Sequence, residues 1–249
     1  MTPIIVTADR YAIVVISNRV WLMGEFGDEN YRNFTLHQQF DDDILVVACQ
    51  SDRYVVLTDK QQLWSVVDET EVKLIDSGVT NVALNDKGLF ILNSDILTAR
   101  RDLMAYTVDG VGYISSDSGR TVRELHTENE VDIVSIIIGQ NHTFHIDENG
   151  KLYQDDQLVT EVNENVVYGV ESVAELPDSL VVLDRKLGLW LGTEFMEDSP
   201  RSIAVVTYIG SIIAIDENYR VWSKVMMEGD NFKVGWHEVS EINSYNYAN

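Results

Sequence analysis

The histidines and the cysteine are the first residues to weigh for chemistry. His142 and His145 stand three positions apart in a strand-and-turn context, where their side chains diverge, so we do not interpret them as paired zinc ligands. Cys49 lies in an apolar run and is interpreted as a small buried hydrophobic residue rather than a nucleophile. No serine–histidine–aspartate elbow, glycine-rich phosphate loop or zinc-spaced histidine pair is present. We therefore predict no catalytic residue, no cofactor and no enzyme activity.

Two acidic clusters could bind a cation, but each has a simpler interpretation. Asp41–Asp43 is a run of carboxylates that we interpret as a solvated loop. Asp147–Gly150 resembles part of a calcium-binding loop, yet it lacks the distal glutamate that completes such a loop. Aspartate, asparagine and glycine are also the residues of hairpin turns, and this segment stands between two apolar runs. We predict a turn there and no metal site.

Similar turns recur between short apolar runs along the whole chain. The stretch Val205–Trp222 has an apolar run, a turn at Gly210–Ser211, a second run at Ile212–Ile215, a second turn and a last run that ends on tryptophan. β-Branched residues separated by turn residues indicate antiparallel strands. The middle run is apolar at every position, which predicts burial of both its faces. One unit cannot bury two faces alone, so it needs neighbouring copies.

Copies of this unit recur along the chain, and each ends on an aromatic residue. These residues are Trp21, Trp64, Phe90, Tyr113, Tyr153, Trp190 and Trp222. Sheet units packed side by side in a ring make a β-propeller. The sequence thus predicts an all-β fold, a seven-bladed β-propeller that forms one domain over residues 1–249. We expect the ring to be closed by strand pairing near the termini, with Ile4–Val6 and Trp236–Val239 as candidate strands.

The charge balance limits the partners that such a protein can bind. The chain has 18 basic and 41 acidic residues, a net charge of −23. A surface this negative repels nucleic-acid phosphates and anionic lipids, so neither direct nucleic-acid binding nor membrane binding is expected. It suits a basic protein partner, or it serves solubility alone, and the sequence leaves both open. With one cysteine, no charged-then-apolar leader and no apolar run of membrane-spanning length, we expect a cytoplasmic or nuclear protein.

One copy of the unit carries a motif of a known family. Ile138–Tyr153 has an apolar residue, the turn Gly139-Gln140-Asn141-His142, an apolar strand, an acidic glycine turn and an aromatic strand. This order resembles the repeat of the regulator-of-chromosome-condensation (RCC1) family, whose members are β-propellers. Propellers of tryptophan–aspartate repeats are the rival interpretation, but none of the tryptophans that end a copy is followed by aspartate.

The resemblance implies a place for the functional residues. In RCC1-like propellers the turn before each central strand lies on one face, around the mouth of the central channel, and carries acidic residues that contact partners. The matching positions here are Asp9, Asp52, Arg101, Asn141 and Asp178, with Gly210 at another. Aspartates from three different blades would then meet on one rim, although aspartate is also a common turn residue. We take these positions as the partner-binding residues.

A propeller is a platform whose fold does not fix its activity. We expect a non-enzymatic protein–protein interaction module that binds a basic protein partner through the acidic loop face. The alternative implied by the resemblance is guanine-nucleotide exchange on a Ran-type small GTPase, which needs no conventional catalytic motif. An exchange factor would also use an inserted hairpin as a wedge at the nucleotide site, and Ser115–Asn129 is the candidate loop.

Overall fold

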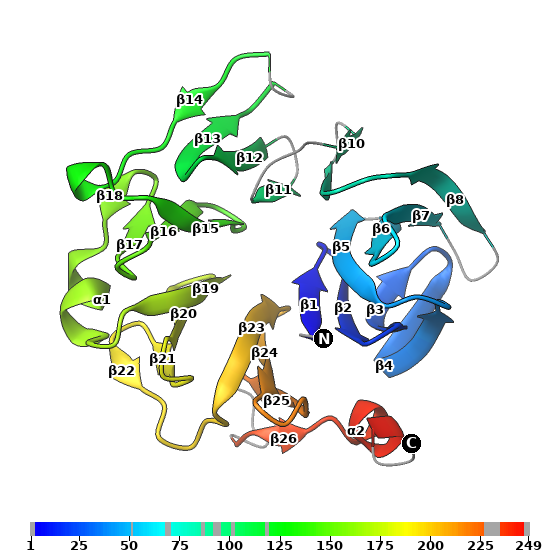
Figure 1. Ribbon diagram of the computed structural model, residues 1–249. Helices are drawn as coiled ribbons and strands as arrows, with labels where there is room; N and C mark the ends of the chain where they lie inside the picture. Colours follow the sequence, from blue (N-terminus) through cyan, green and yellow to red (C-terminus); the bar gives the residue numbers. More distant parts are fainter. Residues whose placement is uncertain are drawn as a thin grey trace.

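Short antiparallel sheets are arranged in a ring in the computed structural model (Figure 1). The structure describes residues 3–50, 52–67, 71–85, 88–91, 96–100, 103–117, 120–226 and 235–246. Within these ranges there are six sheets of four strands and one sheet of two strands. Each four-stranded sheet is a meander, because its strands pair in their order along the chain. This arrangement is a β-propeller, so the prediction of an all-β propeller is confirmed.

We number the four-stranded sheets as blades 1 to 6 in chain order. Blade 1 contains β1 (Ile4–Thr7), β2 (Tyr11–Ile16), β3 (Arg19–Phe26) and β4 (Glu29–Gln39). Blade 2 contains β5 (Ile44–Gln50), β6 (Arg53–Thr58), β7 (Gln62–Val66) and β8 (Val72–Ser77). The two-stranded sheet that follows contains β9 (Val82–Asn85) and β10 (Gly88–Ile91).

The remaining blades occupy the rest of the chain. Blade 3 contains β11 (Leu97–Arg100), β12 (Leu103–Val108), β13 (Val111–Ser115) and β14 (Arg123–Glu124), and a 3-10 turn at Glu128–Glu130 follows. Blade 4 contains β15 (Ile133–Ile138), β16 (Thr143–Asp147), β17 (Leu152–Gln154) and β18 (Gln157–Leu158), followed by α1 (Thr160–Asn165). Blade 5 contains β19 (Val170–Leu176), β20 (Ser179–Asp184), β21 (Leu189–Leu191) and β22 (Glu194–Phe195). Blade 6 contains β23 (Ser202–Tyr208), β24 (Ser211–Asp216), β25 (Val221–Val225) and β26 (His237–Glu238), followed by α2 (Ser240–Asn246).

The prediction of seven blades is wrong, because the structure has six. The unit that ends on Phe90 is the two-stranded sheet β9–β10, which lies between blades 2 and 3 with β9 packed against β5 and β11. Between Ser77, where β8 ends, and Leu97, where β11 begins, the described residues form this hairpin and no further strand. The hairpin therefore carries an inner strand without the outer strands that would complete a blade.

The prediction that strand pairing near the termini closes the ring is also wrong. The N-terminal strand β1 pairs with β2 inside blade 1, and the C-terminal strand β26 pairs with β25 inside blade 6. Blades 6 and 1 meet through side chains instead, in a buried cluster that includes Val14, Trp21 and Ile213. The Tyr208 hydroxyl also donates a hydrogen bond to the backbone oxygen of Arg10 in blade 1. The first and last blades each hold their own four strands, so no strand is exchanged between them.

One turn recurs in blades 2, 4, 5 and 6 and sets where the second strand ends. Its first residue is Thr58, Asp147, Asp184 or Asp216, and its fourth residue has a positive φ: Gln61, Gly150, Leu187 or Tyr219. In each case the amide of the fourth residue donates to the carbonyl of the first. The aromatic residue predicted to end each copy follows the first turn residue by six positions in the sequence, as in Asp216 and Trp222. The turn thus delivers that aromatic to the third strand of the blade.

No helix in the described part of the chain is long and apolar enough to cross a membrane. The helices α1 and α2 are short, and each follows the outermost strand of a blade.

Candidate functional site at the central channel

The innermost strands enclose a channel along the axis of the ring. Its volume is about 410 Å³, and its lining comes from β1, β5, β9, β11, β15, β19 and β23, with a few turn residues. Many of the lining side chains are aliphatic, among them Val6, Leu97, Ile137 and Val206. Small-molecule sites are commonly cavities of about 300–1,000 Å³ with apolar walls and a few polar groups. The channel has the size and the lining of such a site.

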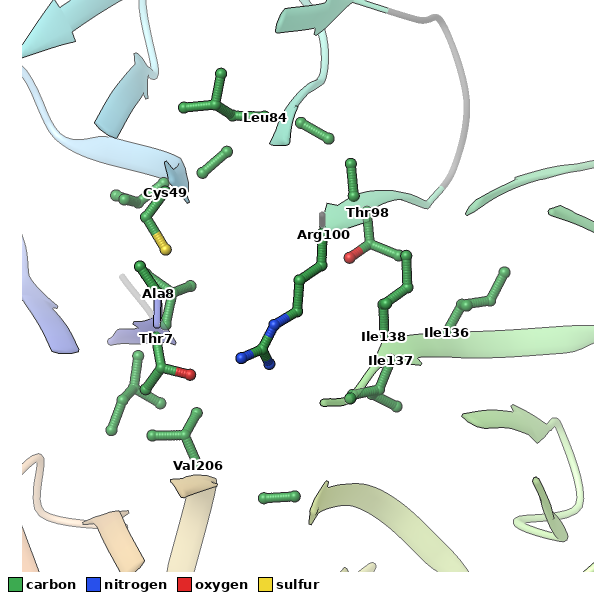
Figure 2. A pocket seen from close by; sticks show the side chains of 18 of the residues that line it. Thr7, Ala8, Cys49, Leu84, Thr98, Arg100, Ile136, Ile137, Ile138 and Val206 are labelled. Atoms are coloured by element: carbon green, nitrogen blue, oxygen red, sulfur yellow. The ribbon is translucent and has the colours of Figure 1, made fainter. Parts of the chain in front are cut away.

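One cationic side chain extends into this channel. Arg100 is the last residue of β11, and Figure 2 shows its side chain reaching from that strand toward Thr7 and Ala8. Its Nη2 donates a hydrogen bond to Asp9 Oδ1 at 3.3 Å, which makes an ion pair between blades 3 and 1. The Arg100 side chain is 20% exposed, so most of it is shielded from solvent. Among the described residues that line the channel, Arg100 is the only basic one.

The channel also holds the single cysteine. Cys49 belongs to β5, and Figure 2 shows its sulfur directed into the open space near Ala8. Burial raises the pKa of the Cys49 thiol to about 12; Arg100 opposes this rise and Asp9 adds to it. A thiol with such a pKa stays protonated at neutral pH and is a poor nucleophile. Cys49 is only partly buried, with its sulfur at the channel wall, so the expectation of a buried small side chain holds in part.

The turns between the first and second strands lie on one face of the ring, which we call the channel-mouth face. Successive turns of a meander alternate between the two ends of its strands, so the turns between second and third strands lie on the opposite face. Hydrogen bonds tie the turns of the channel-mouth face to neighbouring blades. The Tyr11 hydroxyl of blade 1 donates to the carbonyl of Arg53 in blade 2 at 2.8 Å. Glu175 of blade 5 accepts the backbone N–H of Asn141 in blade 4 at 2.9 Å.

These bonds use buried groups and therefore hold the face in one shape. Glu175 is only 9% exposed, and its backbone oxygen accepts a further bond from Thr207 Oγ1 of blade 6 at 2.5 Å. A buried carboxylate that accepts a backbone N–H makes a charge-assisted hydrogen bond, which is stronger than a neutral one. The turns around the channel mouth are thus a pre-organised surface rather than a set of independent loops.

The structure places the predicted binding residues on this face with one exception. Asp9, Asp52, Asn141 and Asp178 are exposed and stand in the turns of blades 1, 2, 4 and 5. Arg101 lies outside the described residues, so its prediction is left as it stands. Asp9 differs from the other aspartates, because its carboxylate pairs with Arg100 at the channel. Asp52 and Asp178 have no ion pair within the part of the chain that the structure describes.

The two histidines singled out in the sequence have separate surroundings. His142 is exposed, and its Nδ1 lies 2.7 Å from Asp155 Oδ2 on the channel-mouth face. His145 is fully buried and stacks on Tyr153 inside blade 4. Within the described residues, no group of three or more histidine, cysteine or acidic side chains is arranged to hold a metal ion. Asp147 instead accepts the backbone N–H groups of Asn149 and Lys151, which makes it a structural turn residue.

Two residues of this region were missed from the sequence. Arg100 was missed because the match to the RCC1 repeat pointed to the next residue, Arg101, as the turn position, whereas Arg100 is the last residue of β11. Glu175 was passed over because nothing in an apolar strand shows that a single acidic side chain binds a neighbouring turn. An alternating pattern along β11, had the strand been longer, could have indicated that Arg100 faces the channel.

Comparisons with known proteins give the fold a context. No protein-family model matches the sequence, and no curated protein matches it. Solved structures do match: human WBSCR16 is 10% identical over 96% of this chain and 82% of that chain, with a TM-score of 0.52. Hsv2 of Kluyveromyces marxianus is 9% identical over 90% of this chain and 93% of that chain, with a TM-score of 0.58.

Yeast RCC1 (Prp20), solved with Kap60 bound, is also matched. It is 13% identical over 89% of this chain and 55% of that chain, and its TM-score of 0.35 is too low to carry an argument. Identities this small show the shared fold alone. The shared fold rests on WBSCR16 and Hsv2, and yeast RCC1 is among the matched structures, in keeping with the resemblance seen in the repeat.

Proposed function

We propose that the chain is a non-enzymatic interaction module that binds a basic protein partner through its channel-mouth face. The observation that carries this proposal is the position of Asp52 and Asp178. Both are exposed carboxylates at equivalent turns of different blades, and neither has an ion pair within the described residues. The turn of Asp52 is fixed by the Tyr11 bond to Arg53. Carboxylates presented on fixed turns suit a partner with complementary basic residues.

The arginines that follow Asp52 and Asp9 in the chain bind other side chains. Arg53 follows Asp52 in the chain, but its Nε donates to Gln50 Oε1 at 3.4 Å. In blade 1, Arg10 lies next to Asp9 but is directed to Glu25, with 3.9 Å between Nη1 and Oε2. The net charge of −23 adds a long-range attraction for cationic proteins.

Nucleotide exchange on a Ran-type GTPase gains no specific support from the candidate wedge loop. Of Ser115–Asn129, Arg123–Glu124 forms the outer strand β14, which pairs with β13. Asp117 accepts hydrogen bonds from the Thr121 amide at 2.8 Å and the Thr121 hydroxyl at 2.6 Å, so the described part of this loop folds back on its own blade. Nucleotide exchange is therefore an alternative outcome that the test below can detect, and not a second proposal.

The test compares charge reversal on the two faces of the ring. A partner is first isolated by affinity capture on the wild-type protein and identified by mass spectrometry. Its association rate is then measured at several salt concentrations with the wild type, with the Asp52→Lys/Asp178→Lys variant and with an Asp59→Lys/Glu148→Lys control. Asp59 and Glu148 are exposed in turns of the opposite face, so the control makes the same change of charge elsewhere.

We expect the channel-mouth variant to lower the association rate by about tenfold, because charges near an interface steer encounter. The opposite-face control should change it much less, and all rates should fall as salt rises, since screening acts over about 8 Å at physiological ionic strength. Equal effects of the two variants, or a rate insensitive to salt, would contradict the proposal. Nucleotide release from a Ran-type GTPase is assayed in parallel, and acceleration lost only in the channel-mouth variant would favour the exchange factor.

A further inference from the structure

The Arg100 guanidinium has more hydrogen-bond donors than its surroundings use. A guanidinium carries five N–H donors in a planar fork. Within the described residues, it makes one hydrogen bond, from Nη2 to Asp9 Oδ1. The remaining donors lie in the channel, where the side chain projects into open space (Figure 2).

Among the described residues that line the channel, few groups are left for this cation to bind. The lining acids are Asp9, which already pairs with Arg100, and Glu175, whose Oε2 accepts the Asn141 amide. The Arg100 donors that Asp9 leaves unused are not among the buried unpaired atoms of the described residues, so they remain accessible from the channel. An anion in the channel would complete the hydrogen bonding of the fork, and a carboxylate matches its geometry with two parallel bonds.

The rest of the lining selects the kind of anion. Asp9 already neutralises part of the charge of Arg100, so a second negative charge on the ligand would be repelled. That disfavours a phosphate dianion and favours a monoanion. Side chains such as Leu97, Ile137 and Val206 present aliphatic surface to the channel. Binding a ligand with an apolar body would remove this surface from water, which is favourable. The cavity of about 410 Å³ limits the ligand to a small molecule or to the last residue of a chain.

We propose that the central channel binds a small organic carboxylate, with its carboxylate on Arg100 and its apolar body against the aliphatic wall. Asp9 acts as a positioning residue, because its ion pair holds the guanidinium across the channel. The same chemistry could come from a free aliphatic acid or from the C-terminal leucine of a peptide. This site lies inside the ring and shares Asp9 with the channel-mouth face, but it does not include Asp52 or Asp178.

The experiment uses hexanoate as the probe and 1-hexanol as its neutral counterpart. Binding to the full-length protein is followed by NMR of isoleucine δ1-methyl groups. Saturable shifts are expected for the channel-lining Ile136, Ile137 and Ile138. Ile215 and Ile242 pack elsewhere, in the cluster between blades 6 and 1, and should stay unchanged. Hexanol should bind at least tenfold more weakly than hexanoate.

The second part of the experiment measures hexanoate binding by the Arg100→Gln variant, with Arg10→Gln as the control. Arg10 is on the same face, but its side chain is 67% exposed and pairs with Glu25. The dissociation constant of hexanoate should rise at least tenfold in Arg100→Gln and stay unchanged in Arg10→Gln. Acetyl-Ala-Ala-Leu with a free C-terminus is compared with its amide, and tighter binding of this peptide than of hexanoate identifies a chain terminus as the source.

Three results obtained with bound ligand would overturn the proposal. They are hexanol binding as tightly as hexanoate, shifts confined to methyl groups outside the channel, and an unchanged affinity in folded Arg100→Gln. If Arg100→Gln does not fold, the wild-type methyl map and the hexanol comparison still decide the question. Absence of any saturable shift with hexanoate and with the peptide also excludes the site.

Discussion

His145 illustrates how this protein keeps a titratable side chain neutral inside a blade. The residue is fully buried, and its ring stacks on Tyr153 with 4.7 Å between centroids and 3° between planes. Its Nε2 lies 2.9 Å from the backbone oxygen of His126, so this nitrogen carries the proton and donates. Nδ1 is buried and has no hydrogen-bond partner. Burial lowers the pKa of His145, against the hydrogen bond to His126 and the charge of Asp147, which both favour the protonated ring.

This burial makes stability depend on pH in a defined direction. Below the ordinary histidine pKa of 6.5 the unfolded chain takes up a proton that folded His145 does not. The free energy of unfolding should therefore keep this contribution above pH 6.5 and lose it as the pH falls, by at most about 1.4 kcal/mol per pH unit. Denaturant titrations between pH 7.5 and 5 on the wild type and His145→Phe measure this contribution. The phenylalanine keeps an aromatic ring on Tyr153 and should flatten the dependence.

His126→Gln is the control for that measurement, because the His126 side chain is exposed. It should leave the pH dependence as in the wild type. An identical slope in wild type and His145→Phe would mean that carboxylates alone set the acid response.

At the scale of elements, the turn shared by blades 2, 4, 5 and 6 shows what one side chain contributes. In blade 5 the Asp184 Oδ1 accepts the amides of Lys186 and Gly188, and Oδ2 accepts Trp190 Nε1 at 2.9 Å. Blade 6 repeats these bonds around Asp216 and Trp222. The carboxylate thus fixes both the turn and the aromatic of the next strand.

Blade 2 lacks this arrangement, because Thr58 stands where the aspartate would be. The hydroxyl of Thr58 and the Nε1 of Trp64 are both buried and have no hydrogen-bond partner. Each such group costs about 1–3 kcal/mol. Blade 2 therefore leaves two buried polar groups unpaired at a place where blades 5 and 6 pair a carboxylate with a tryptophan.

Exchanging the two residue types should change stability with opposite signs. Asp184→Thr should lower the free energy of unfolding by about 2–4 kcal/mol, because it removes charge-assisted bonds and leaves Trp190 Nε1 unpaired. Thr58→Asp should raise it by about 1 kcal/mol by giving Trp64 Nε1 an acceptor. Chemical denaturation at 0.15 M salt measures both, with Thr58→Val as the control that changes the unpaired hydroxyl but adds no acceptor. If Thr58→Asp destabilises more than Thr58→Val, the equivalence of these turns is incorrect.

The same turns explain how much of the fold could be predicted. The sequence located the hairpin of every sheet, from β2–β3 to β24–β25, because turn residues separate strands that are apolar along their length. The predicted number of blades was wrong because a hairpin becomes a complete blade only when outer strands pair with it. The outermost strands β14, β18, β22 and β26 have two residues each, too few to show any alternation. A hairpin with outer strands and one without them therefore look alike in sequence.

At the scale of the whole molecule, the ring is held by clusters of side chains between neighbouring sheets. Such clusters join blades 1 and 2, blade 2 and β9, blades 3 and 4, blades 4 and 5, blades 5 and 6, and blades 6 and 1. Between β9–β10 and blade 3, contact is made mainly by the inner strands β9 and β11. The ion pair of Arg100 with Asp9 lies near this two-stranded sheet and links blade 3 to blade 1.

The C-terminal helix α2 packs at the interface between blades 6 and 1, as α1 packs at the interface between blades 4 and 5. In α1, Val162 is buried between blades 4 and 5, and Asn163 Oδ1 accepts the Leu152 amide of β17 at 2.8 Å. In α2, Ile242 is buried between blades 6 and 1, and Asn243 Oδ1 accepts the Val221 amide of β25 at 3.0 Å. Because no strand crosses from one end of the ring to the other, α2 supplies part of the closure that strand exchange would otherwise give.

Ile242→Ala should therefore weaken the ring at its closure. Truncating a buried isoleucine costs about 2–5 kcal/mol, and here the loss falls on an interface without shared strands. Hydrogen exchange followed by mass spectrometry should show faster exchange in β1–β4 and β23–β26 than in the other blades. Val162→Ala is the matched control, since its loss should speed exchange in β15–β22 instead. Faster exchange spread evenly around the ring in both variants would show that the propeller opens as one cooperative unit and that α2 has no special part in closing it.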